Sequence, residues 1–217
     1  MTIKVIPPEG SVKDQTLQEF IVKFWKYLCP LPKDQSPAWN NDGSKDESFN
    51  ERIGEDLFML CFSREPQDTV TRTCNVPTNK GLFIPVMSVE VSQCEKPKAT
   101  ENELRKIADK DQASIHPKSL HLELDGVPLD LARYRFDGQQ GPKLDVTFPT
   151  DEENAIFPNI TTNSCEAVAA GHYVWTEPLS LGQHTIRWKG NLECSPSEEC
   201  IDENYLEDIT YQVNVVK

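Results

Sequence analysis

The segment from residue 57 to residue 95 places the strongest constraint on the fold of this chain. Residues 57–63, 70–76 and 81–91 form three runs that are separated by turn-forming residues. Thr71, Thr73 and Val76 give the second run the β-branched character that is typical of strands. Pro85 within the third run favours an edge position or a bulge. The segment therefore predicts three successive strands of a β-sandwich.

An amphipathic helix is expected before these strands, over residues 14–29. Thr16 and Glu19 have the spacing of a capping box, and the helix should end before Pro30. Apolar residues recur at the spacing of one helix face: Leu17, Phe20, Ile21, Phe24, Trp25 and Leu28. This face predicts that Phe20, Phe24 and Trp25 are buried against the sheet, and binding of a partner or a lipid is the alternative.

The rest of the chain favours more strands and one further helix. Thr100 and Glu103 form a second capping box, which predicts a short helix to about residue 109. Further strands are expected at residues 120–124, 127–131, 144–148, 171–177, 184–189 and 209–216, and residues 30–56 are expected to form a loop. Since 217 residues suit one large all-β domain, we predict a single antiparallel β-sandwich over residues 1–217.

The charge of the chain excludes several classes of partner. The formal net charge is −13, which argues against nucleic acid and against anionic membrane surfaces, because both require Lys and Arg. No apolar stretch approaches the 18 residues that a membrane span needs. The first residues do not resemble a signal peptide. The sequence therefore predicts a soluble acidic protein that is cytoplasmic, or secreted with its leader removed.

Seven cysteines are many for a chain of this length, and their odd number leaves at least one unpaired. Cys194 and Cys200 flank a short loop that a disulfide could close, and we expect this bond in oxidised protein. Cys61, Cys74 and Cys94 fall on consecutive predicted strands, where a bridge is also feasible. Buried free thiols and zinc are the alternatives. No C-x-x-C pair and no Cys/His quartet with the spacing of a structural site is present, which argues against zinc. We expect no metal and no cofactor.

Several segments come in an order that resembles a known family: TRTCNVPTNKGLFIPVMSVEVS, ENELRKIA, LELDGVPL, GHYVWTEPLSLGQHTIRWKG and DITYQVNVV. The family consists of mostly bacterial proteins with no assigned activity, and the resemblance covers residues 17–216. It implies an Ig-like or jelly-roll fold and no particular reaction. The chain departs from the family's pattern at Phe24–Trp25, where paired Trp is usual, and in a cysteine-bearing insertion at residues 191–208.

The candidate ligand-binding residues are Arg72, His172, Tyr173, Trp175 and His184. If Arg72 points inward from its strand, it needs a carboxylate partner, or it binds a ligand. Tyr173 and Trp175 lie on the same side of a strand, where they either form a sugar-stacking strip or pack in the core. His172 and His184 could join His121 in a metal triad, or they are ordinary surface or hydrogen-bonded histidines.

Two functional hypotheses follow. The first is a non-catalytic binding or structural module for an unknown ligand, such as a protein or a carbohydrate. The second is a hydrolase or metal-dependent enzyme that uses strand-borne His, Arg and acidic residues. A single cleft that holds at least three members of one set would favour the enzyme, and scattered positions would favour the module. The set is Arg72, His121, His172, His184, Asp68 and Glu90.

Overall fold

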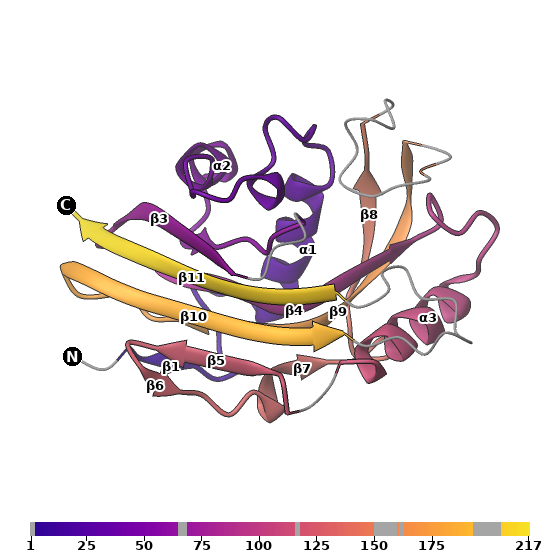
Figure 1. The fold of residues 1–217 in the computed structure, drawn as a ribbon. Coiled ribbons are helices and arrows are strands. Elements are labelled where there is room, and N and C mark those ends of the chain that lie inside the picture. Colours follow the sequence, from indigo (N-terminus) through magenta and orange to yellow (C-terminus); the bar gives the residue numbers. More distant parts are fainter. Residues whose placement is uncertain (1–2, 65–68, 116–117, 150–159, 161–162, 193–204) are drawn as a thin grey trace.

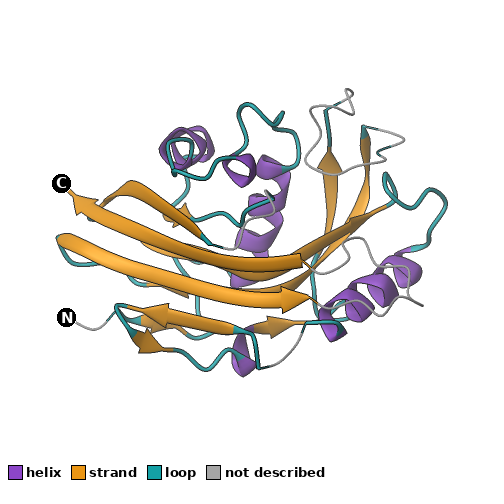
Figure 2. Ribbon diagram, viewed as in Figure 1, coloured by secondary structure: helices purple, strands orange, loops and turns teal. Residues whose placement is uncertain are grey.

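A computed structural model describes residues 3–64, 69–115, 118–149, 160, 163–192 and 205–217. Its strands form two facing sheets, with helices packed around the first (Figures 1 and 2). The first sheet has the order β1 (Val5–Ile6), β9 (Ser164–Thr176), β4 (Gly81–Ser92) and β2 (Leu57–Met59), and β7 (Arg135–Phe136) and β8 (Lys143–Thr147) also pair with β9. The second has the order β3 (Val70–Pro77), β11 (Tyr205–Val216), β10 (Gly182–Leu192), β5 (His121–Leu124) and β6 (Val127–Pro128).

The sheets are mixed, so the prediction of a purely antiparallel sandwich of the Ig-like or jelly-roll kind is wrong in this respect. β3 pairs in parallel with β11, and β2 pairs in parallel with β4. The prediction treated the three strands of residues 57–95 as neighbours. In the structure, however, β2 and β4 belong to the first sheet, whereas β3 belongs to the second. β3 and β4, which follow one another along the chain, therefore lie in different sheets.

The two predicted helices are present, and both capping boxes are confirmed. α1 (Leu17–Leu28) begins after Thr16 and buries the whole predicted face, Trp25 included. α3 (Glu101–Ala113) begins after Thr100 and packs on β4 and β9. Because helices cover both faces of the first sheet, most of β4 and β9 is buried. None of the helices in the described ranges is long and apolar enough to span a membrane.

A third helix, α2 (Asp46–Ile53), lies in the segment that was expected to be a loop. Its sequence is mostly polar, which is why periodicity did not indicate it, and it ends at Gly54 in a left-handed conformation with a φ of 64°. Two short 3₁₀ turns, η1 (Pro37–Trp39) and η2 (Ala132–Tyr134), complete the described elements.

Two large hydrophobic clusters hold the layers together. One lies between the two sheets and includes Trp188 and Tyr211, whose rings stack 5.5 Å apart. The other lies between α1 and the first sheet and includes Phe24 and Tyr173. A smaller cluster joins α3 to the opposite face of β4 and β9. β4 is therefore packed from both sides, and this packing positions the cavity described below.

One disulfide connects Cys94, just after β4, to Cys165 in β9, and Cys165 was not a predicted partner. Cys61 and Cys74 are buried free thiols. Their predicted bridge is absent because Cys74 lies in the second sheet, whereas Cys61 follows β2 of the first. The predicted pair Cys194 and Cys200, together with most of the expected insertion at residues 191–208, lies outside the described residues.

Candidate functional site

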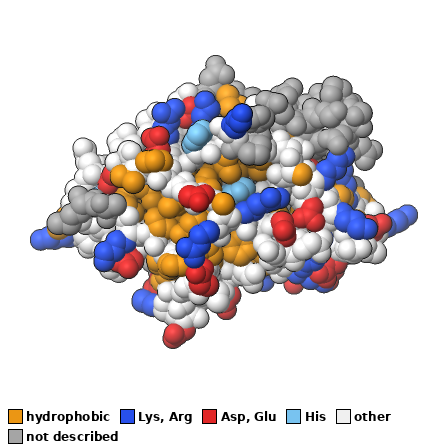
Figure 3. Space-filling view, turned by 90° about the horizontal axis from the view of Figure 1, so that it is seen from below, with side chains coloured by type: hydrophobic (Ala, Val, Ile, Leu, Met, Phe, Trp, Pro, Cys, Tyr) orange, Lys and Arg blue, Asp and Glu red, His pale blue; other side chains and the backbone are white. Residues whose placement is uncertain are grey.

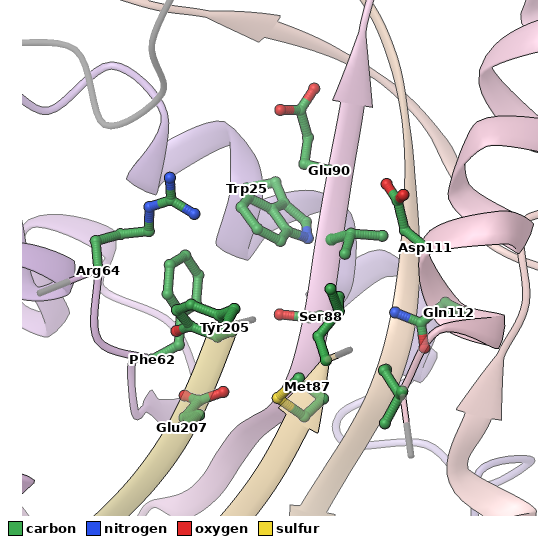
Figure 4. A pocket seen from close by; sticks show the side chains of 13 residues that line it. Trp25, Phe62, Arg64, Met87, Ser88, Glu90, Asp111, Gln112, Tyr205 and Glu207 are labelled. Atoms are coloured by element: carbon green, nitrogen blue, oxygen red, sulfur yellow. The ribbon is translucent and has the colours of Figure 1, made fainter. Parts of the chain in front are cut away.

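A cavity of about 60 Å³ lies beside the middle of β4 (Figure 4). β2 pairs with β4 only from Gly81 to Phe83, and the cavity begins past this point, at Met87. Four parts of the fold contribute its polar side chains: β4, the end of α3, β11, and the segment after β2. These side chains are Ser88, Glu90, Asp111, Gln112, Glu207 and Arg64. Trp25 of α1, Phe62 and Tyr205 supply aromatic walls.

Several polar groups in this cavity are buried without hydrogen-bond partners. Glu90 is 2% exposed, and within the described part of the chain neither of its carboxyl oxygens has a partner. The same holds for the side-chain amide of Gln112, which is 4% exposed, and for the hydroxyl of Ser88. Burying such groups without partners costs free energy. They are therefore the groups that a bound molecule would satisfy.

The buried carboxyl groups favour their protonated forms. Burial raises the pKa of Glu90 well above its usual range, and the charge of Glu95 raises it further, while the nearby Ser92 hydroxyl opposes both effects. Burial also raises the pKa of Glu207 to about 8, although the Trp188 indole N–H donates to its carboxyl at 2.9 Å. At neutral pH Glu207 therefore carries a proton in the free protein, and burial favours the same protonated form of Glu90.

Arg72 lies outside the cavity and binds the backbone of the segment that carries Phe62, one of the lining residues. It is fully buried, and its Nη1 donates to the carbonyl oxygen of Cys61 and to the Tyr211 hydroxyl, both at 2.7 Å. Its Nη2 donates to the carbonyl oxygen of Phe62 at 3.2 Å. The Tyr211 hydroxyl also donates to Asp46 at 2.9 Å, which links Arg72 to a carboxylate through Tyr211. Arg72 thus holds the backbone of the wall and is not a cavity-lining residue.

The three strand histidines lie in three different places. His172 lines a neighbouring pocket with Arg135, and burial together with the charge of Arg135 lowers the pKa of this histidine to about 4. His121 lies beside Arg187 in a shallow depression, and His184 lies in a third pocket near Ser180. Asp68 is outside the described residues. The described members of the set proposed as an enzyme cluster are therefore scattered.

Tyr173 and Trp175 are buried in the cluster between α1 and the first sheet. The Trp25 indole N–H donates to the Tyr173 hydroxyl at 3.0 Å, and the Trp175 indole N–H donates to the carbonyl oxygen of Pro7 at 3.0 Å. Packing in the core, one of the two interpretations of this pair, is therefore confirmed. The other, an exposed strip that stacks on sugars, is wrong because both side chains are buried.

Asp125, His184 and Ser180 form an arrangement that superficially resembles a catalytic triad. Nδ1 of His184 lies 2.7 Å from Asp125, and Nε2 lies 3.3 Å from the Ser180 hydroxyl. However, Nε2 is closer, at 3.0 Å, to the backbone carbonyl of Ser180. Asp125 also accepts the backbone N–H of Thr185 at 2.9 Å. These bonds attach the turn between β5 and β6 to β10, so the arrangement is a structural clamp.

The sequence indicated only part of the cavity. Glu90 belongs to the set predicted for an enzyme, and its carboxyl group within the mostly apolar run of β4 can be recognised in the sequence as a candidate functional group. Asp111 and Gln112 lie beyond the predicted end of their helix, and Glu207 lies before the predicted start of the last strand. Comparison with models of protein families, with characterised proteins and with solved structures found no match for this chain.

Proposed function

We propose that this protein is a non-catalytic binding module whose ligand is a small molecule held in the cavity beside Glu90. The observation that carries the proposal is the set of buried polar groups without hydrogen-bond partners: both Glu90 oxygens, the Gln112 amide and the Ser88 hydroxyl. Such groups, combined with apolar and aromatic walls, are the usual composition of a small-molecule site.

Binding is favoured over hydrolysis or metal-dependent catalysis by the positions of the reactive side chains. The described histidines lie in three separate pockets, and Arg72 is occupied by backbone carbonyls. Within the described ranges, no three His, Cys, Asp or Glu side chains are grouped so that they could hold a metal ion. The cavity itself combines acids with an amide and aromatic rings, which suits recognition more directly than nucleophilic attack.

A second, more open pocket adjoins the cavity. It has a volume of about 430 Å³ and shares Gln112 and Ile115 with the first, and Leu120, Leu131 and Ala132 give it apolar walls. Figure 3 shows hydrophobic side chains gathered on the face seen from below, with charged and histidine side chains among and around them. A ligand with its polar end in the inner cavity could therefore extend an apolar part into this pocket.

Nuclear magnetic resonance tests this proposal with a library of small polar fragments. We expect fragments to shift the backbone amide signals of residues 88–90 and 111–115. Ser88→Leu should abolish these shifts by filling the cavity, whereas Ser164→Leu, the same change at an exposed position of β9, should leave them unchanged. Shifts confined to other regions, or unaffected by Ser88→Leu, would contradict the proposal.

A further inference from the structure

The cavity combines an unpaired buried acid with aromatic walls, and this combination identifies a class of ligand. We propose that the ligand is an organic ammonium ion whose charged nitrogen pairs with Glu90. The inference rests on the binding function proposed above and adds the chemical class of the ligand.

The first argument is the balance of charge. Glu90, Asp111 and Glu207 contribute three carboxyl groups to the cavity lining, and Arg64 contributes one guanidinium group. The charge of Arg64 acts on Glu95, whose pKa it lowers against the larger effect of burial. Glu90 and Glu207 are protonated in the free protein, so the excess of acids takes effect once Glu90 ionises: its charge then attracts a bound cation and would repel an anion.

The second argument is hydrogen bonding. The two oxygens of Glu90 and the hydroxyl of Ser88 project from the same strand (Figure 4), and each can accept a bond that no described group donates. An ammonium nitrogen has up to three N–H donors on one atom. A charge-assisted bond to a carboxylate is shorter and stronger than a neutral one. An ammonium group therefore supplies the donors that the Glu90 carboxyl group lacks.

The third argument comes from the apolar part of the lining. Trp25, Phe62 and Tyr205 present aromatic rings to the cavity, and aromatic faces attract ammonium groups. Met87 and Ile115 provide aliphatic surface that suits a carbon chain. A bare metal ion would make no favourable contact with these apolar walls. Within the described residues, no group of three potential ligands could hold a metal ion. An organic cation uses both parts of the cavity.

Binding of such a cation should release a proton. Three further groups interact electrostatically with Glu90: Glu95 on the loop after β4, Cys29 directly after α1, and Tyr173 of β9. Burial raises the pKa of Cys29 and of Tyr173, so both are neutral at pH 7.

The other charged and titratable groups that line the cavity with Glu90 are Asp111, Glu207, Arg64 and Tyr205. The Ser92 hydroxyl lies near Glu90 but donates to Glu95 at 2.8 Å, so within the described residues neither Glu90 oxygen has a hydrogen-bond partner of normal geometry. Glu90 is therefore protonated when the cavity is empty and must ionise to pair with an ammonium group. Affinity for the amine should rise with pH until the amine itself loses its charge.

Isothermal titration calorimetry with n-butylamine and 1-butanol tests the proposal, because the two molecules have the same size and differ in charge. We expect the wild-type protein to bind the amine at least tenfold more tightly than the alcohol at pH 7. Titrations in buffers of different ionisation enthalpy should show about one proton released per amine bound. Glu90→Gln should remove the preference and the proton release, and Glu123→Gln, at an exposed site on β5, should keep both.

The outcomes separate this inference from the proposed function. If the alcohol binds as tightly as the amine, or if Glu90→Gln leaves the preference intact, the ammonium assignment is overturned while a binding cavity remains. If neither molecule binds and the fragment library also gives no shifts at residues 88–90, both proposals fail. Circular dichroism of Glu90→Gln confirms that the variant is folded, which is expected because Gln has nearly the shape of the protonated acid.

Discussion

Single buried acids should make the stability of this protein depend on pH, and Glu207 is the clearest case. Its pKa in the folded protein is about 8, against an ordinary value of 4.5, so the folded state retains a proton that the unfolded chain loses. The stabilising effect of this proton is complete below pH 4.5 and is lost as the pH rises to 8. The loss is at most about 5 kcal/mol, at about 1.4 kcal/mol per pH unit.

Glu207→Gln should therefore reduce the pH dependence of the free energy of unfolding between pH 4.5 and 8, and the part due to Glu90, Glu95 and Asp46 should remain. The variant cannot ionise, and its amide oxygen can still accept the Trp188 N–H. Urea unfolding at several pH values measures the effect, with Glu123→Gln as the matched control at an exposed site. A wild-type stability that is constant across this interval would show that Glu207 ionises normally.

The clamp between Asp125 and β10 makes a second prediction at the scale of the residue. Asp125→Ala removes the contact with His184 and the bond from the Thr185 N–H, and we expect a loss of about 2 kcal/mol in stability. Asp145→Ala, at an exposed position of β8, should change stability by less than about 0.5 kcal/mol. Equal effects of the two substitutions in denaturant unfolding would mean that the clamp contributes nothing.

At the scale of the element, α1 offers an internal comparison. Trp25 is buried and donates to Tyr173, whereas Tyr27 on the same helix is 36% exposed. Trp25→Ala should lower the free energy of unfolding by about 3–5 kcal/mol, and Tyr27→Ala by less than about 1 kcal/mol. Urea denaturation of the two variants measures both. An unchanged midpoint for Trp25→Ala would mean that the helix face is not packed as described.

The disulfide that joins β9 to the end of β4 should also matter. Cys94 and Cys165 are 71 residues apart, and a bridge that closes a loop of this length stabilises a fold by about 4 kcal/mol through the entropy of the unfolded chain. Adding reductant should lower the wild-type unfolding midpoint accordingly. A Cys94→Ser, Cys165→Ser double variant should start at the lower midpoint and respond far less, and an equal response from both proteins would contradict the assignment.

The sequence predicted those helices and strands whose patterns are contained in a short stretch of the chain. The capping boxes at Thr16 and Thr100 and the apolar face around Trp25 are complete within a few residues, and both helices begin where predicted, although α3 continues to Ala113, past its predicted end near residue 109. The pairing of β3 with β11 joins residues far apart in the chain, and no local pattern shows which sheet a strand enters. The cavity was missed for the same reason, since Glu90, Gln112 and Glu207 meet only through the fold.

The whole molecule should be most stable on the acidic side of neutrality. Burial is the largest cause of the raised pKa values of Glu90, Glu95, Glu207 and Asp46, the last of which rises to about 6. All four favour the folded state at low pH and lose this effect as the pH rises above about 4.5. The net charge of −13 acts in the same direction, because repulsion grows as acids ionise. Thermal unfolding should give a higher midpoint at pH 5 than at pH 8, and the reverse order would contradict this balance.

The central claim is that the fold keeps an unpaired, protonated acid in a cavity that a cation can enter. The most direct test follows the side-chain carboxyl carbon of Glu90 by nuclear magnetic resonance as the pH is raised, with and without n-butylamine. We predict that Glu90 titrates well above its ordinary value of 4.5 in the free protein, and that the amine shifts its midpoint to lower pH. A Glu90 that titrates near 4.5 and does not respond to the amine would contradict the account.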